Sequence, residues 1–585
     1  MRQVERWLLV GTMVVATGAL ASGLGRTDLW PPDEARVAEI AREMTASASW
    51  VVPQLNGRPF LEEPPLFYWL QAAAYRLAGD PSTAAARFPA AAAAIIGMLV
   101  TAAMARRLGA RPLLAVLVLT TAPEYWWMAH SATPDTAAAA ATALALWLFF
   151  AAWQSGRRGL LAGSVAAMGV AFGCKSFLPV GLATLVMLAF VVCAGWGRLR
   201  ARELVLAVFG MTGVLVAWLL IVARDAGAEA VKFFIITNHL GRFAGVRDEG
   251  HLRSLLYYVP NLALGLFPWS IVLPAAVAGA WRERTTPTRL FPLLWAGGMT
   301  AVLTLSASKR AHYLLPAYPA FAVLVAQWWP HAWGRRADRI VIRLMILPVL
   351  IGGPVLVLVL LGVRPVDLLA MAAAARGSRA AWSMAPPQGL SVTGTAWVVV
   401  AALATLGLVV LRANRARNPL RAAASLAAYL TAIHLLLTLV ILPNLNPLCT
   451  ARPWAERLGR VADRGVPVVA FGFTDASALS PFMFYARRQF PELQDVELLV
   501  AQLQVRPACA LMREQAYAAV ASLLPGSPVP RRALNGLRFV VVESHRGLCS
   551  MESTAVGTAA AVDGEAWYTP LAPQLVGADH VAAFR

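Results

Sequence analysis

The feature that most constrains the fold is a series of long apolar stretches. Through the first three quarters of the 585-residue chain, apolar stretches of about 20 residues follow one another. Each is long enough to cross a hydrocarbon core of about 30 Å as a helix. Only 14% of the residues are charged, against about a quarter in soluble proteins. The sequence therefore predicts a polytopic α-helical membrane protein.

Thirteen transmembrane spans are predicted, and an odd number places the two termini on opposite sides of the membrane. The spans are 7–25, 87–105, 112–129, 135–153, 160–174, 178–195, 203–223, 259–281, 290–307, 312–330, 341–362, 392–411 and 422–442.

The net charge of +20 is explained by the distribution of arginine between the two sides. The N-terminal segment and the alternate connections on its side contain twenty arginines and four acids. Cytoplasmic loops collect Lys and Arg, so this side is predicted to be cytoplasmic. The charge then needs no nucleic-acid partner. The first span is interpreted as a retained signal anchor, and the C-terminal part is expected in the periplasm of a bacterial inner-membrane protein.

The organisation predicted is a membrane domain over 1–442 and a periplasmic α/β domain over 443–585. The first outer loop, about 26–87, carries eight acids. In the outer domain, 466–473 and 537–543 have the composition of buried strands, 513–524 that of a helix, and 496–505 that of a strand or helix edge. Its three cysteines allow one disulfide, which we assign as a hypothesis to Cys509 and Cys549.

The strongest local motif is Trp30-Pro-Pro-Asp-Glu-Ala-Arg36 in this first loop. Asp33 follows two prolines and opens a short helix, where an Asp N-cap is an ordinary arrangement worth about 1 kcal/mol. Yet Asp33 lies just outside the membrane beside Glu34, with Arg36 one turn on. A carboxylate there can act as a general base, and an arginine can bind phosphate with forked donors. Local sequence gives the two interpretations about equal weight.

Other polar residues near the outer surface have the same two interpretations. Tyr68 is typical of an interfacial aromatic belt, and Lys309 with Arg310 is typical of interfacial snorkelling. Lys175 interrupts a long apolar stretch, which marks either a functional charge or a short outer turn. His239 and Arg242 belong to an outer loop, and the histidine fits a polar loop residue better than a metal ligand. The sequence contains no Cys-x-x-Cys or His-Glu-x-x-His pattern.

Several ordered motifs resemble the aminoarabinose transferase and protein O-mannosyltransferase family, whose members are GT-C glycosyltransferases. The resemblance covers about residues 1–330 and rests on Asp33-Glu-Ala-Arg-Val-Ala-Glu-Ile40, Trp50-Val-Val-Pro-Gln-Leu-Asn-Gly-Arg-Pro-Phe60, Glu63-Pro-Pro-Leu-Phe-Tyr-Trp69, His239-Leu-Gly-Arg-Phe243, Phe267-Pro-Trp-Ser270 and Ser308-Lys-Arg-Ala-His-Tyr-Leu-Leu-Pro-Ala-Tyr-Pro319.

The resemblance implies a GT-C fold and an inverting transfer of sugar from a polyprenyl phosphate such as undecaprenyl phosphate. The roles expected are catalytic for Asp33, Glu34 and Asp135; donor-phosphate binding for Arg36, Lys175, Lys309, Arg310 and Tyr313; and substrate binding for Glu63, Tyr68, His239 and Arg242. No cofactor is assigned, and a divalent metal ion is left open.

One position departs from the family pattern. The family usually has Lys where Glu63 stands, and that lysine is implicated in binding the lipid phosphate. A glutamate repels phosphate, so either Lys309, Arg310 or Lys175 supplies the positive charge, or this member has lost donor binding.

The function predicted is transfer of a sugar from a polyprenyl-phosphate donor to lipid A, an envelope glycan or a protein at the periplasmic face. The alternatives are a polytopic transporter and a catalytically inactive relative that binds the lipid carrier. A transporter predicts internal repeats with interrupted helices, and no such repeat is visible. The sequence does not identify the sugar, the acceptor, a metal requirement or the oligomeric state.

Overall fold

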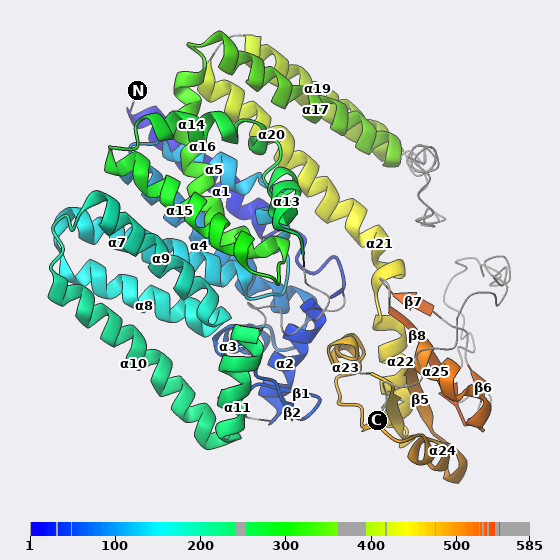
Figure 1. Cartoon of the computed structure of the whole chain (residues 1–585). Helices are drawn as coiled ribbons and strands as arrows, with labels where there is room; N and C mark the ends of the chain where they lie inside the picture. The colour runs from blue at the N-terminus through cyan, green and yellow to red at the C-terminus, as the bar shows by residue number, and fades with distance from the viewer. Residues whose placement is uncertain are drawn as a thin grey trace.

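The computed structural model contains a helical bundle and a smaller α/β unit at one end of it (Figure 1). It describes residues 2–30, 33–47, 49–241, 253–360, 394–415, 418–473, 476–525, 527–528, 532–534, 537–544 and 549.

Helices lie at the position of every predicted span. They are α1 (Arg2–Leu20), α4 (Thr83–Arg107), α5 (Pro112–Thr120) with α6 (Pro123–Ala129), α7 (Asp135–Ser155), α8 (Arg158–Lys175), α9 (Phe177–Ala194), α10 (Ala201–Ala226), α13 (Tyr258–Gly265) with α14 (Leu273–Arg282), α15 (Pro287–Leu305), α16 (Tyr318–Ala332), α17 (Arg336–Leu360), α19 (Gly394–Arg415), and α20 (Pro419–Leu436) continuing through η5 (Leu437–Ile441) into α21 (Leu442–Cys449). The ends of the spans predicted over 341–362 and 392–411 fall partly outside the described residues.

Six of these helices, among the described residues, are long and apolar enough to cross a membrane by themselves. They include α4, α7 and α10, which have 25, 21 and 26 residues. The segment predicted as one span over 112–129 is divided instead, because Pro123 restarts the helix after Thr121 and Ala122. The chain is a multi-pass membrane protein, and thirteen crossings stay a prediction.

The two sets of connections predicted for opposite sides lie at opposite ends of the bundle. At one end, Arg107 donates to Gln154 at 2.9 Å and Arg158 pairs with Glu203 at 2.8 Å. At the other end, Asp135 pairs with Lys175 at 2.7 Å. Helix α7 runs from Asp135 to the arginine-rich end, about 30 Å away for its 21 residues.

The first outer loop is folded on itself. It contains α2 (Asp33–Ser47), a hairpin of β1 (Gln54–Leu55) and β2 (Arg58–Pro59), and α3 (Leu66–Ala78). The Asn56-Gly57 turn has positive φ at both residues, 54° and 73°, a conformation that Asn-Gly favours in two-residue hairpin turns. Glu43 of α2 accepts hydrogen bonds from both of their backbone N–H groups, at 2.6 and 3.1 Å. The turn is therefore tied to α2.

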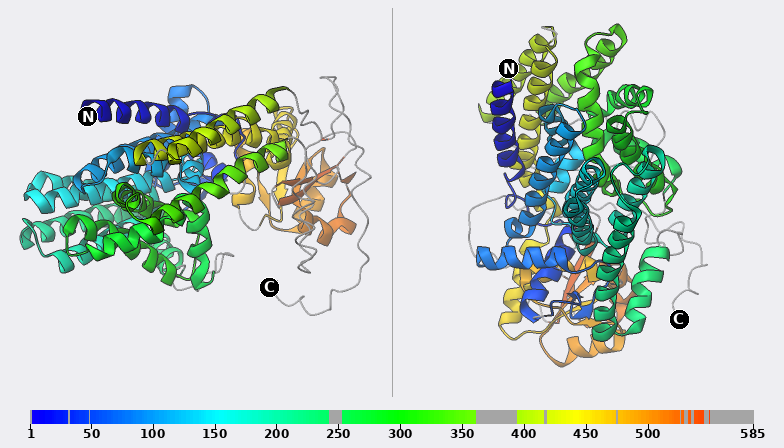
Figure 2. Two further views of the ribbon diagram at one scale, coloured as in Figure 1. Left: turned by 90° about the horizontal axis from the view of Figure 1, so that it is seen from above. Right: turned by 90° about the vertical axis from the view of Figure 1, so that its left-hand side faces the viewer.

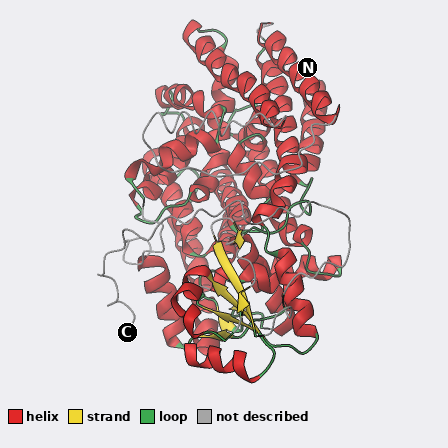
Figure 3. Cartoon of the chain, turned by 90° about the vertical axis from the view of Figure 1, so that its right-hand side faces the viewer, coloured by secondary structure: helices red, strands yellow, loops and turns green. Residues whose placement is uncertain are grey.

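The α/β unit contains one mixed sheet, whose strands are yellow in Figure 3. Its strand order is β4-β3-β5-β8-β6, and β7 pairs with β8. The strands are β3 (Val468–Phe471), β4 (Glu492–Leu493), β5 (Cys509–Arg513), β6 (Ser527–Pro528), β7 (Arg532–Leu534) and β8 (Leu537–Glu543), and the helices are α22 (Arg452–Asp463), α23 (Ser480–Ala486), α24 (Val496–Val505) and α25 (Glu514–Val520). The β3–β4 and β3–β5 pairs are parallel.

The two predicted strands and the helix over 513–524 are confirmed in this unit with small shifts. The segment 496–505 is a helix, α24, and the buried strand β5 was missed because its apolar run, 508–512, is only five residues long. Arg513 ends β5 and does not belong to the helix that follows. The predicted boundary at 443 falls inside α21, so the first helix of the unit begins at Arg452.

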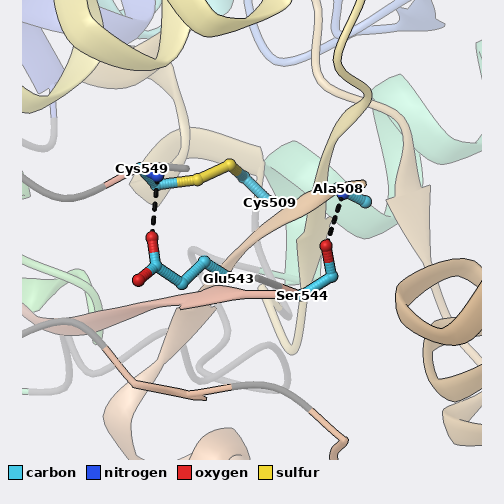
Figure 4. The surroundings of a disulfide bond; sticks show 5 residues. All are labelled: Ala508, Cys509, Glu543, Ser544 and Cys549. Carbon is cyan, nitrogen blue, oxygen red and sulfur yellow. Dashed lines mark hydrogen bonds between the residues drawn. A yellow bond between two sulfur atoms is a disulfide. The ribbon is translucent and has the colours of Figure 1, made fainter. Parts of the chain in front are cut away.

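The disulfide hypothesis is confirmed, since Cys509 of β5 is bonded to Cys549 (Figure 4). Glu543 at the end of β8 accepts a hydrogen bond from the Cys549 backbone N–H at 2.7 Å, and Ser544 accepts one from Ala508 at 2.9 Å. Cys174, Cys193 and Cys449 are free thiols.

The α/β unit packs directly on the first outer loop, at one end of the bundle (Figure 2). Tyr75 of α3 and Phe484 of α23 have ring centroids 6.5 Å apart in a common hydrophobic core. Asn56 donates to the Phe490 carbonyl at 2.8 Å, and the Tyr485 hydroxyl accepts from the Leu29 N–H at 2.6 Å. The loop that carries the Asp33 motif is therefore held between the bundle and the sheet.

Candidate functional site

Asp33 binds two arginines from distant parts of the chain. Its Oδ1 accepts from Arg36 at 2.9 Å and its Oδ2 from Arg310 at 2.6 Å. Arg36 lies one turn on in α2, whereas Arg310 comes from the turn between α15 and η4 (Ala311–Ala317). The Asp33 side chain keeps 30% of its surface exposed. Ordinary N-capping needs neither arginine, so the contacts favour the functional interpretation.

The pKa of Asp33 reflects two opposing effects. Burial acts to raise the pKa, but the Arg36 and Arg310 guanidinium groups outweigh it, so the pKa lies below its ordinary value of 3.8. Asp33 is therefore ionised at neutral pH. A substrate that drew either arginine away would raise the pKa and make the carboxylate a stronger base.

Glu34 has contacts of a different kind. Arg87 of α4 donates to both of its oxygens at 2.8 and 2.9 Å, and the Ala132 N–H donates at 2.8 Å. Arg87, only 3% exposed, also donates to the carbonyls of three residues, Leu24, Thr27 and Asp28. These contacts show Glu34 joining the loop to the bundle. They do not support the catalytic role expected from the sequence.

Asp33 lies on the wall of a large cavity, about 790 Å³ in volume. Trp30, Glu34 and His312 line the same end of it, together with the half-exposed Trp127. The remaining wall is mainly apolar and comes from α6, α13, α17 and α20–α21, for example Leu264, Leu430, Ile433, Leu437 and Leu442. The cavity thus combines a charged mouth with an apolar interior, as an amphiphilic ligand requires.

A second charged cluster lies beside the first. Lys175, at the end of α8, donates to Asp135 at 2.7 Å and to Glu63 at 3.2 Å. The Tyr313 ring centroid is 5.7 Å from the Lys175 ammonium. His312 Nε2 lies 3.7 Å from Asp135, and the His312 side chain also lines the large cavity. His312 therefore stands between the Asp33 cluster and the Lys175 cluster.

A π-helix, η1 (Phe233–Leu240), holds the Lys175 cluster from behind. His239 hydrogen-bonds Ser176, next to Lys175, at 2.5 Å, and Ser176 has an unusual positive φ of 70°. Asn238 donates to the Glu62 carbonyl, next to Glu63, at 2.9 Å. The contacts of His239 are those of a positioning residue for Lys175. The substrate contact expected for this histidine stays a prediction.

The other predicted residues have varied surroundings. The Lys309 ammonium donates to the carbonyls of Ser306 and Arg253 and is 2% exposed, so it is tied to backbone and is a poor phosphate ligand. Tyr68 is buried in the core of the first loop, which fits neither an interfacial belt nor an open binding site. Arg242 lies outside the described residues.

Two residues were missed in the sequence, His312 and Arg87. His312 was part of a recognised motif but had no local feature to distinguish it, and Arg87 was counted only as the end of a loop. Both matter through contacts that sequence spacing does not reveal. No group of three or more metal-ligating side chains lies among the described residues.

Comparison with known proteins agrees with the resemblance seen in the sequence. Residues 62–222 match the family of dolichyl-phosphate-mannose-protein mannosyltransferases. The undecaprenyl phosphate-alpha-4-amino-4-deoxy-L-arabinose arabinosyl transferase of Edwardsiella ictaluri is 32% identical over 348 residues, 57% of this chain and 61% of that protein. The same enzyme of Pseudomonas paraeruginosa is 32% identical over 339 residues, 55% and 59% of the two chains. The chain spans about three fifths of the length of these relatives.

Among solved structures, the chain resembles ArnT from Cupriavidus metallidurans bound to undecaprenyl phosphate. The TM-score is 0.72 at 24% identity, over 93% of this chain and 99% of that one. The apo state of the same protein gives 0.71 at 24% identity, with the same coverage. The chain therefore has the GT-C fold predicted from its sequence.

Proposed function

We propose that the protein is a glycosyltransferase that takes a sugar from a polyprenyl-phosphate donor at the outer face of the bacterial inner membrane. The N-terminus is cytoplasmic and the α/β unit periplasmic, as the arginine distribution indicates. Lipid A is the first choice of acceptor, since the two relatives described above are aminoarabinose transferases. Other envelope glycans and protein hydroxyl groups are second.

The observation that supports the proposal best is the position of Asp33, which binds Arg36 and Arg310, on the wall of a mainly apolar cavity. A polyprenyl phosphate is an apolar chain with an anionic head, so its binding site needs both an apolar cavity and positively charged side chains. Arg310 and Arg36 supply forked donors for phosphate oxygens. The Arg36 Nε has no acceptor among the described residues, which leaves it donor capacity for a ligand.

The chemistry is a single displacement at the anomeric carbon, which inverts its configuration. The acceptor oxygen forms the new bond to that carbon while the bond from carbon to phosphate oxygen breaks. Polyprenyl phosphate leaves with the electron pair, and the acceptor proton passes to the Asp33 carboxylate. Arginine at the phosphate stabilises the charge that develops on the leaving group.

Donor binding and base strength are coupled in this arrangement. In the structure both Asp33 oxygens accept from the arginines that the phosphate requires. A phosphate that takes Arg310 or Arg36 removes the interaction that holds the Asp33 pKa down. The base is then strengthened only when the donor is in place, which protects the enzyme from acting without it.

Glu63 requires an explanation in a phosphate-binding protein. Its partner Lys175 provides the positive charge beside the site, at 3.2 Å. Burial raises the pKa of Glu63, Lys175 lowers it, and Asp135 raises it, with a net shift upward. A phosphate that binds nearby raises the pKa of Glu63 further. We therefore propose that Glu63 takes up a proton as the donor binds and that the neutral side chain does not repel the donor phosphate.

The test is turnover by the purified chain in detergent. Release of polyprenyl phosphate is measured with a panel of polyprenyl-phosphate sugars, with and without lipid A. Acceptor-dependent release from at least one donor supports the proposal. Donor binding without release would indicate a lipid-carrier-binding relative, and absence of both would return the chain to the transporter class.

A further inference from the structure

A second pocket lies at the end of the bundle farthest from Asp33. It has a volume of about 360 Å³ and is formed where the start of α17 meets the end of α19. Three arginines line it: Arg339, Arg343 and Arg415. The rest of its lining is Trp333, Ile342, Ile346, Leu347, Leu350, Leu411 and Asn414.

The pocket and the α/β unit are separated by a full membrane thickness. Helix α20 begins at Pro419, four residues after Arg415, and continues through η5 and α21 to Cys449 beside the α/β unit (Figure 1). About thirty residues at 1.5 Å each span roughly 45 Å. The pocket thus lies at the arginine-rich end of the bundle, which the positive-inside rule assigns to the cytoplasm.

The three arginines lack carboxylate partners within the described part of the chain. Arg339 donates to the Trp333 carbonyl at 2.9 Å, and neither Arg343 nor Arg415 has an ion pair there. Asp338 is the nearest acid in sequence, but it is not paired with any of them and does not line the pocket. No carboxylate of the described residues therefore compensates the charge of the pocket.

Arg343 is the least expected of the three. It lies seven residues into α17, about 10 Å along a helix that continues as an apolar span. A charge at such a depth is costly unless it has a partner or reaches the interface. Ile346, Leu347 and Leu350 continue the pocket wall below it toward the membrane interior. A ligand that meets Arg343 must therefore be anionic at one end and apolar at the other.

We infer that this pocket binds the headgroup of an anionic phospholipid from the cytoplasmic leaflet. The arginines bind the phosphodiester, and the acyl chains lie along the apolar faces of α17 and α19. Basic pockets between transmembrane helices on the cytoplasmic side are suited to such lipids. This inference is independent of the proposed glycosyl transfer, because the pocket shares no residue with the Asp33 cavity.

The experiment compares lipid retention by native mass spectrometry of the full chain in detergent. The probes are phosphatidylglycerol, which is anionic, and phosphatidylethanolamine, which is zwitterionic. The pocket variant is Arg339→Gln, Arg343→Gln and Arg415→Gln combined. The matched control is Arg106→Gln, Arg335→Gln and Arg412→Gln, which removes the same charge from exposed arginines outside the pocket. Thermal unfolding of both variants verifies that they are folded.

The expected result is preferential retention of phosphatidylglycerol by the natural chain and the control. Each hydrogen-bonded arginine contact to the phosphodiester contributes roughly a fivefold change in affinity, so loss of three such contacts should make the pocket variant bind on the order of a hundredfold more weakly. Equal loss in the control would show general surface attraction and overturn the inference. Unchanged retention in the pocket variant, or equal retention of phosphatidylethanolamine, would overturn it as well.

Discussion

Arg87 and Glu34 provide a sharp test of which acid in the first loop is structural. Arg87→Met removes two hydrogen bonds to Glu34, of 2.8 and 2.9 Å, and leaves a mostly buried carboxylate without its countercharge. It also strips the donor from three backbone carbonyls. Breaking a buried pair in this way costs about 3 to 5 kcal/mol. Glu34→Gln keeps the oxygen that accepts from Ala132 but loses the charge, so about 2 kcal/mol is expected.

The assay is unfolding of the two single variants and the double variant in mixed micelles with increasing denaturing detergent. Each single variant loses the Arg87–Glu34 interaction, whereas the double variant loses it only once. The double variant should therefore be about 2 kcal/mol more stable than the sum of the two single losses predicts. Below its unfolding transition, Glu34→Gln should keep most of the natural turnover. Additive losses would refute the pairing, and loss of turnover in folded Glu34→Gln would refute its structural role.

Three further predictions follow from the charged clusters and the disulfide. Lys175→Met leaves the buried Asp135 without its lysine countercharge, so it should destabilise the protein by about 3 kcal/mol and weaken donor binding; unchanged stability and unchanged KM together would argue against the cluster. The raised pKa of Glu63 means that its neutral form is favoured as pH falls, so donor affinity should rise on acidification, and Glu63→Gln should bind about tenfold more tightly at pH 8 with this pH dependence removed. A Glu63→Gln variant with the natural pH dependence would exclude Glu63 as the titrating group. Cys509→Ser removes the disulfide that joins two cysteines 40 residues apart, so the free energy of unfolding of the α/β unit should fall by about 4 kcal/mol. Unfolding is measured with and without reductant, and equal stability of the variant and the natural protein would contradict this.

Much of the architecture could be predicted because it depends on local signals. Long apolar stretches, alternating arginine-rich connections and the Asn56-Gly57 turn each carry their physical cause within a few residues. The Cys509–Cys549 pairing was correct but rested on little more than location in one compartment. Strand β5 was missed because its apolar run, 508–512, is too short to distinguish a strand from a helix segment by periodicity.

The site was predicted less completely, since its chemistry depends on contacts across the fold. Asp33 and Arg36 share a motif, but Arg310 reaches Asp33 from 277 residues away. The pairing of Glu63 with Lys175 brings a positive charge from another helix to the position where the family usually has Lys. Lys309 and Arg310 are neighbours with the same charge, but their side chains point in different directions. The Lys309 ammonium binds backbone carbonyls, whereas Arg310 binds Asp33 in the site.

The central claim is that Asp33 accepts the acceptor proton, and the most direct measurement takes turnover and donor binding from one preparation of Asp33→Asn. Sugar transfer by Asp33→Asn should fall by at least a hundredfold. Donor binding should be retained or strengthened, because the amide no longer competes with phosphate for Arg36 and Arg310. Transfer at the natural rate by Asp33→Asn would contradict the account and leave Asp33 as an anchor for the two arginines.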